Sequence, residues 1–192
     1  MIKIAVVGDI GSGKSHVAKQ FGYPVFNADS EVTKLYRKSK KCYYKLKKKL
    51  PAYITSFPVQ KNKLSRAVMD NQNNLKKITK IIHPLVRKRM NIFFKRKKNK
   101  KIVVLDIPLL MENKINKNNY VLVFIEAKQK EIKKRLKKRS NFKMKTLNKL
   151  KKLQLPLEFK KKNSDFIIKN NFKDYTTKKN VKRVLKKILL NA

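Results

Sequence analysis

The chain has 192 residues and a mass of 22.7 kDa, the size of one compact domain, and 41% of its residues are hydrophobic. It carries 53 Lys and Arg against 11 Asp and Glu, a formal net charge of +42, but its hydrophobic content excludes a disordered polycation. The sequence contains 45 lysines and 18 asparagines. Compositional drift explains this skew as easily as selection for a polyanionic partner does. The charge alone therefore identifies no partner.

Other classes of protein are excluded by short features of the sequence. The single cysteine, Cys42, allows neither an internal disulfide nor a cysteine pair for a metal, which favours a reducing compartment. The longest apolar stretch, Ile102–Met111, has ten residues and is too short for a membrane span. The first residues, Met1–Val7, lack the features of a secretory signal. We therefore expect a soluble cytoplasmic protein with no membrane association.

Continuous apolar runs predict strands that are buried on both faces of a parallel sheet. The predicted strands are Ile2–Val7, Tyr23–Phe26, Ile102–Ile107, Val121–Glu126 and Phe166–Ile168. Helical periods fall between and after them, at residues 32–36, 43–50, 75–82, 86–94, 132–136, 147–150 and 181–188. This alternation predicts an α/β fold, with a parallel sheet of about five strands flanked by helices.

The segment from residue 30 to residue 100 is predominantly helical and is too long for one crossover. We expect it to be a helical substrate-binding insertion within a single domain that spans residues 1–192. The lysine runs Lys47–Lys49, Lys97–Lys101 and Lys160–Lys162 stand at the ends of predicted elements, where solvated faces or loops are expected.

The segment Gly8–Ser15 fits the pattern G-x-x-x-x-G-K-[ST], with a predicted strand before it and a helical pattern, His16–Phe21, after it. A glycine-rich loop lets backbone N–H groups turn toward phosphate oxygens, and the next helix adds its positive N-terminal end. Lys14 would neutralise the β- and γ-phosphates, and the Ser15 hydroxyl would ligate Mg²⁺. Three of the four glycines lie in this segment, so we interpret it as a phosphate-binding loop, or P-loop.

Two of the eleven acids follow predicted strands, and the carboxyl ends of strands in an open parallel sheet face the ligand crevice. Asp29 could accept a proton from a substrate hydroxyl, or it could cap the helix that begins near Ser30. Asp106 could be a Walker-B acid that holds Mg²⁺ directly or through water, or a turn residue before Pro108. Position alone leaves both pairs of alternatives open.

Further motifs follow the P-loop in a fixed order. They are Asn27-Ala28-Asp29, Ile82-His83-Pro84, Pro108–Glu112, Gln154 and Ser164–Asn170. With these motifs and with its helical insertion between the second and third strands, the chain resembles dephospho-CoA kinase over about residues 2–172. The resemblance implies a P-loop NTPase-type fold with acceptor-binding helices over residues 30–100 and a lid over residues 128–160.

The resemblance also implies a reaction, the transfer of the γ-phosphoryl group of ATP to the ribose 3′-hydroxyl of dephospho-CoA, which gives CoA and ADP. Mg²⁺ is the implied cofactor, ATP is the co-substrate, and we expect a monomer. Asp29 matches the family's base. Arg135 and Arg139, four apart on one predicted helix face, resemble lid arginines whose planar forks bind phosphate oxygens; the alternative is a solvated face.

The implied site residues fall into groups. The catalytic residues are Asp29, Lys14 and Arg139; the ATP-binding residues are Gly8, Gly11, Ser12, Gly13, Lys14, Ser15, His16, Arg135, Arg139 and Asn170; the acceptor-binding residues are Asp29, Lys61 and His83; and the metal ligands are Ser15 and Asp106. His83 fits a turn or packing residue as well as a pocket residue. Glu112 is expected to brace or cap the loop after the third strand, with no chemical role.

The chain departs from the family's pattern at four positions. Asp9 stands where a second glycine is usual, and a carboxylate there is tolerable only if it points outward or pairs with a cation. Asn27 replaces the first acid of an Asp-Ala-Asp motif. Ser140 stands where an aspartate is common. Lys61 replaces an arginine and makes a poorer bidentate contact with phosphate.

Two other functions compete with this interpretation. Another P-loop small-molecule kinase, such as a nucleoside monophosphate kinase, would lack the Pro108–Glu112 and Gln154 motifs. A basic nucleic-acid-binding NTPase would use the net charge, but the sequence offers neither a recognised binding module nor aromatic stacking platforms beside a basic stripe. We therefore expect no specific nucleic-acid partner.

Overall fold

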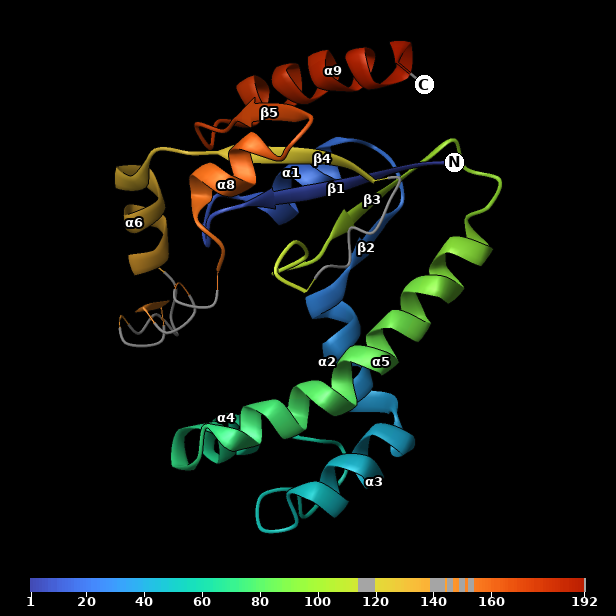
Figure 1. Ribbon diagram of the computed structural model, residues 1–192, viewed down its shortest axis with the longest axis vertical. Coiled ribbons are helices and arrows are strands. Elements are labelled where there is room, and N and C mark those ends of the chain that lie inside the picture. The colour runs from blue at the N-terminus through green and yellow to red at the C-terminus, as the bar shows by residue number, and fades with distance from the viewer. Residues whose placement is uncertain (114–119, 139–143, 145–146, 149–150, 152–153, 192) are drawn as a thin grey trace. The chain divides into compact units, whose positions relative to one another are not determined.

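In the part of the chain that the structure describes, five parallel strands form one sheet in the order β2-β3-β1-β4-β5 (Figure 1). They are β1 (Ile2–Gly8), β2 (Val25–Asn27), β3 (Ile102–Asp106), β4 (Tyr120–Glu126) and β5 (Phe166–Lys169). This computed structural model describes residues 1–113, 120–138, 144, 147–148, 151 and 154–191. The predicted parallel α/β sheet is confirmed, although the second strand begins two residues later than predicted.

The described helices carry labels that follow their order in the chain. They are α1 (Lys14–Gln20), α2 (Ala28–Lys38), α3 (Lys40–Lys49), α4 (Lys61–Asp70), α5 (Asn73–Arg96), α6 (Gln129–Lys137), α8 (Leu157–Lys162) and α9 (Asp174–Leu190). None of them is both long enough and apolar enough to cross a bilayer. The chain divides into two compact units, which we call the sheet unit (Met1–Asn27 with Lys97–Ala192) and the helical unit (Ala28–Arg96).

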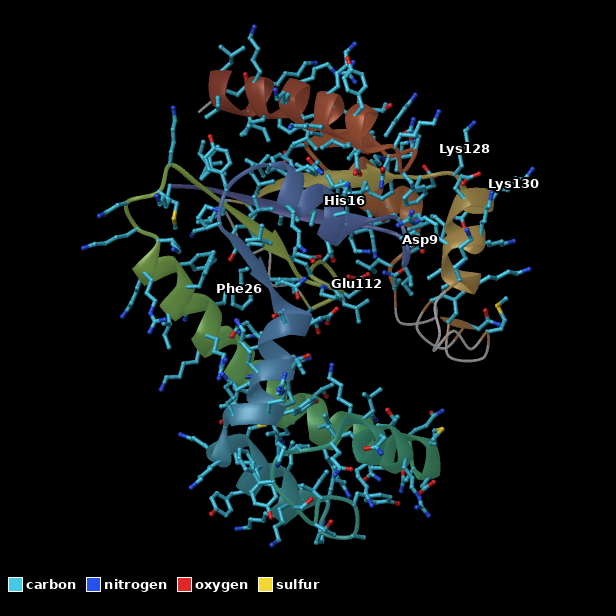
Figure 2. The ribbon with its side chains drawn as sticks, turned by 180° about the vertical axis from the view of Figure 1, so that it is seen from behind. Asp9, His16, Phe26, Glu112, Lys128 and Lys130 are labelled. Carbon is cyan, nitrogen blue, oxygen red and sulfur yellow. The ribbon has the colours of Figure 1, made fainter. Side chains whose placement is uncertain are left out.

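The sheet unit is built on strands that are apolar on both faces. One face of the sheet packs against α1 and α9 in a core to which all but the shortest strand contribute buried residues, among them Ile4, Val6, Val104 and Ile125. Figure 1 shows α8 in front of the sheet with α1 behind it, and the view from behind in Figure 2 agrees. Helices on both faces explain why every residue of β3 is buried and why the strands are continuous apolar runs.

The helical unit has its own core, which includes Leu35, Leu46, Ile54 and Ile78. Its helix α3 begins at an N-cap, where the Ser39 hydroxyl accepts a hydrogen bond from the backbone N–H of Cys42 at 3.2 Å. Such caps satisfy backbone donors that the first helical turn leaves without partners.

Helix α5 differs from the sequence prediction because it runs unbroken through Pro84. A proline inside a helix removes one hydrogen bond and costs about 3 kcal/mol. Ile82 before it and Met90 after it are both buried, and this burial offsets the cost. The helical patterns at residues 75–82 and 86–94 therefore belong to one helix, and the alternative of a turn at His83 is wrong.

Candidate active site

The P-loop joins the carboxyl end of the central strand β1 to helix α1. Its three glycines have φ angles of 144°, 86° and 89°, which side chains rarely tolerate. A Cβ atom on Gly8 would lie 2.7 Å from the Ile125 carbonyl oxygen, and one on Gly13 would lie 2.5 Å from Nδ2 of Asn170. The loop therefore requires glycine for its backbone conformation and for its close packing.

Lys14 points back over its own loop. Its Nζ donates hydrogen bonds to the backbone carbonyl oxygens of Asp9 at 2.7 Å and Gly8 at 3.2 Å. Burial lowers the pKa of Lys14 below its usual range, although the negative charges of Asp106, Asp9 and Glu112 oppose this shift. A desolvated ammonium in a glycine loop is suited to bind phosphate oxygens, which would stabilise its charged form.

A second feature of the loop is the hydroxyl of Ser12. Within the described residues its Oγ is buried and has no hydrogen-bond partner. A buried hydroxyl without a partner is costly, and an anion in the loop could accept its hydrogen bond.

Asp9 takes an arrangement that the sequence analysis did not foresee. Its side chain is 5% exposed, and its carboxylate accepts hydrogen bonds from the Ile10 backbone N–H at 2.7 Å and from Nε2 of Gln129 at 2.8 Å. It neither points outward nor forms a side-chain ion pair in the described part of the chain, so the expectation of one or the other is wrong. Two neutral donors satisfy the carboxylate instead.

This contact joins the P-loop to the beginning of α6. Figure 2 shows Asp9 beside the end of α6 that carries Lys128 and Lys130. Arg135 lies on the same helix, and its guanidinium carbon stands 4.6 Å from the centroid of the Phe172 ring. That ring in turn approaches Gly13 of the loop. The other predicted lid arginine, Arg139, and its neighbour Ser140 lie outside the described residues.

Asn170 braces the P-loop from the end of β5. Its side chain is buried, and its Nδ2 donates to the Ser12 carbonyl oxygen at 2.8 Å. Its Oδ1 accepts from the Phe172 backbone N–H at 2.9 Å and from the Thr177 hydroxyl at 3.0 Å. The amide thus ties the loop to the turn before α9.

Asp106 ends β3 beside β1, and Asn27 ends β2 directly opposite it in the parallel register. The Asn27 amide donates a hydrogen bond to Oδ2 of Asp106, whose carboxylate is almost fully buried. Because Asn27 is neutral, it stabilises the neighbouring carboxylate as a hydrogen-bond donor, whereas a second acid would repel it.

The side-chain oxygens of Ser15 and Asp106 fit a magnesium ion that is bound mainly through phosphates. The described residues contain no group of three or more His, Cys, Asp or Glu side chains that could hold a metal alone. Mg²⁺ usually keeps waters and needs only one or two protein carboxylates beside substrate phosphates. Ser15 in the first turn of α1 and Asp106 are of the required chemical type.

Sequence reasoning missed Lys160 of α8. Its side chain is only 3% exposed, and its Nζ lies 2.5 Å from Oε1 of Glu112. The expectation of a solvated lysine run at Lys160–Lys162 is therefore wrong for its first member. The spacing in the sequence could have indicated its burial, because Lys160 shares a helix face with the apolar Leu157, three residues earlier.

Glu112 lies in the turn after β3, and its charge acts on Lys14 of the P-loop. The same Oε1 accepts a hydrogen bond from the Leu155 backbone N–H at 3.1 Å. Glu112 does brace a loop, as expected, but it does so by holding α8 and a buried cation.

The remaining predicted residues lie elsewhere in the two units. His16, in α1, pairs with Asp174 at 3.0 Å and so joins the first turns of α1 and α9. Asp29 is the second residue of α2, where a negative charge favours the helix dipole, so it does not occupy the position before the helix that a cap requires. Its side chain is exposed.

Lys61 and His83 lie in the helical unit with Asp29. Lys61 Nζ donates to the Thr33 hydroxyl at 2.9 Å, and that hydroxyl donates to the Asp29 carbonyl oxygen at 2.9 Å. Lys61 is therefore held at the start of α4 against the end of α2 that carries Asp29. His83 lies in α5, where partial burial and the charge of Arg87 lower the pKa of its imidazole.

Comparison with known proteins agrees with this geometry. A family model described as dephospho-CoA kinase matches residues 2–174. The chain is 35% identical to a dephospho-CoA kinase of Bartonella quintana over 98% of each chain. Among solved structures it is similar to TT1252 from Thermus thermophilus, with a TM-score of 0.80, 26% identity and coverage of 99% and 97%. It is also similar in fold to dephospho-CoA kinase from Campylobacter jejuni, with a TM-score of 0.66, 21% identity and coverage of 97% and 96%.

Proposed function

The chain belongs to the dephospho-CoA kinase family, and on that basis we propose that it transfers the γ-phosphoryl group of ATP to the ribose 3′-hydroxyl of dephospho-CoA. The observation that carries the proposal is the P-loop with its desolvated Lys14, beside the strand-end carboxylate of Asp106.

The P-loop binds the phosphates of ATP. Its backbone N–H groups and the first turn of α1 face the anionic oxygens, and Lys14 exchanges its carbonyl contacts for the β- and γ-phosphates. The Ser12 hydroxyl, which has no partner within the described residues, gains an acceptor when phosphate binds. Asn170 holds the loop through its hydrogen bond to the Ser12 carbonyl oxygen.

Mg²⁺ would be held by the Ser15 hydroxyl and by Asp106, directly or through water, together with the phosphates. When bound, it would neutralise charge on the β- and γ-phosphate oxygens. Asn27 fixes the orientation of the Asp106 carboxylate by its hydrogen bond.

Asp29 is the proposed base. Its exposed carboxylate accepts the proton of the ribose 3′-hydroxyl as the hydroxyl oxygen attacks the γ-phosphorus. The bond from the γ-phosphorus to the β,γ-bridging oxygen breaks, and ADP leaves. Lys61, held near the Asp29 end of α2, and His83 bind the acceptor in this proposal, while Arg135 neutralises phosphate charge.

The test measures ADP release with dephospho-CoA and with AMP as alternative acceptors. We expect turnover with dephospho-CoA only, and Asp29→Asn lowers kcat by about 10²- to 10⁴-fold, the usual contribution of a general base. Affinity for ATP, measured by calorimetry, stays within about twofold because Asp29 is not part of the P-loop.

Asp70→Asn provides the control, because Asp70 is another partly exposed acid of the helical unit, at the end of α4. It should leave kcat unchanged. Turnover with AMP but not dephospho-CoA would refute the proposed acceptor, and an Asp29→Asn variant with normal kcat would refute the proposed base.

A further inference from the structure

A buried lysine beside the P-loop, Lys160, has no part in the proposed phosphoryl transfer. Lys160 is 3% exposed, whereas its neighbour Lys161 has a side chain that is 37% exposed. Lysine is almost never buried unless it is paired, because removing an ammonium from water costs several kcal/mol. The partner is Glu112, whose Oε1 lies 2.5 Å from the Lys160 Nζ.

The charge of Lys160 acts on the P-loop lysine. Lys160, Glu112, Asp106 and Asp9 all lie close enough to Lys14 for their charges to interact with its ammonium group. Two ammonium groups near each other in a desolvated site are unfavourable unless negative charge accompanies them. The acids supply part of that charge, and a phosphate that binds Lys14 would add further negative charge that both lysines can contact.

The position of Glu112 indicates which phosphate this would be. In the sheet order, β1 with the P-loop stands between β3 and β4. Phe172 and Asn170, which contact the loop residues Ser12 and Gly13, follow β5 on the β4 side. Asp106 and Glu112 follow β3 on the other side, where the proposed metal and the transferred group would lie.

We propose that Lys160 is a second phosphate-binding cation, held by Glu112 and contacting the γ-phosphoryl group of ATP. This inference rests on the proposed kinase reaction. Glu112 is a positioning residue, because it fixes both the Lys160 ammonium and the backbone at Leu155, at the start of the segment leading into α8. During transfer Lys160 stabilises the charge on the γ-phosphoryl oxygens and takes no proton.

The test compares binding of ADP with binding of the non-hydrolysable β,γ-imido analogue of ATP, measured by calorimetry with Mg²⁺ present. Lys160→Met should weaken binding of the analogue by about 10- to 100-fold, the usual effect of losing a charge-assisted hydrogen bond. Binding of ADP should change less than about threefold, because ADP has no γ-phosphate. Equal weakening of both nucleotides would overturn the proposal, since a merely structural role would affect both alike.

Lys161→Met is the matched control. Lys161 lies next along the same helix and also pairs with a glutamate, Glu126 at 2.8 Å, but that pair is partly exposed. The control should leave both affinities within about twofold. If it reduces analogue binding as much as Lys160→Met does, general loss of positive charge explains the result and the proposal fails.

A second variant guards against misfolding caused by an unpaired Glu112. In Glu112→Gln/Lys160→Met neither member of the buried pair is charged, and the glutamine oxygen can still accept from the Leu155 N–H. The double variant should fold and still discriminate poorly between analogue and ADP, whereas recovery of normal discrimination would overturn the proposal. Lys160→Arg should keep most of the preference for the analogue.

The binding measurements contain no acceptor. Failure of the dephospho-CoA reaction with normal γ-phosphate discrimination would therefore refute the proposed acceptor and leave the role of Lys160 intact.

Discussion

Replacing Asn170 with alanine should loosen the P-loop and lower stability. The side chain makes three hydrogen bonds, to the Ser12 carbonyl oxygen, the Phe172 N–H and the Thr177 hydroxyl, at 2.8 to 3.0 Å. Each hydrogen bond contributes about 0.5–1.5 kcal/mol net to stability, and the alanine variant leaves all three partner groups without the Asn170 amide. We expect a loss of about 2–4 kcal/mol, a large share of the roughly 5–15 kcal/mol that stabilises a typical domain.

Urea unfolding measures this loss as a shift in midpoint at constant m-value. Asn180→Ala is the matched control, because the Asn180 amide also donates to a backbone carbonyl, that of Lys169 at 2.8 Å, but in an exposed position. The control should cost less than about 1 kcal/mol. Affinity for Mg-ATP should fall in Asn170→Ala and stay normal in the control.

The bracing role of Asn170 would be refuted if the two alanine variants had equal stability. It would also be refuted if Asn170→Ala were destabilised with unchanged nucleotide affinity, because the contact with Ser12 would then have no influence on the loop.

Two further predictions concern titratable groups. Cys42 is fully buried and its pKa is raised to about 11, mainly by burial, against an ordinary value of 9.0, so the thiolate is about a hundredfold scarcer than in a free thiol. A disulfide reagent should therefore modify Cys42 only after unfolding in urea, and labelling of the native protein at the rate of free cysteine would contradict this. The pKa of Lys14 is lowered from its usual value of 10.5, so its ammonium loses its proton at a lower pH than a free lysine does. The value of kcat/KM should therefore fall with rising pH before pH 10.5 is reached. Bound phosphate raises the pKa of Lys14 again, so kcat should begin to fall only at a higher pH than kcat/KM does. If kcat/KM falls only at or above pH 10.5, with folding checked by circular dichroism, the lowered pKa of Lys14 is refuted.

The features that local sequence determines were predictable. The P-loop is eight consecutive residues between a strand and a helix, and three glycines with positive φ mark it. Asp106 was identifiable because an apolar run ends at it. The strand predicted at Tyr23 starts later, at Val25, and Pro24 before it has no N–H to donate to the sheet, although its carbonyl accepts from Val104 at 2.9 Å.

The features that depend on distant parts of the chain were not predictable. Gln129, which satisfies the buried carboxylate of Asp9, is 120 residues away along the chain. Lys160 resembles its exposed neighbours until the fold brings Glu112 to it. Pro84 is an interior helix residue because buried side chains before and after it outweigh its local preference. In each case tertiary contacts, which a single sequence does not display, override a sound local expectation.

The balance of charge around Lys14 has a consequence for how the chain changes over evolutionary time. Among the described residues, two cations, Lys14 and Lys160, act there with three anions, Asp9, Asp106 and Glu112, although the whole sequence has only eleven acids. Exposed lysines farther away than about 10 Å are screened by salt, whereas these buried groups are screened much less. The surface can therefore gain lysines by mutation while the electrostatics of phosphate binding stay nearly constant. Such insulation allows a chain to reach +42 and keep its chemistry.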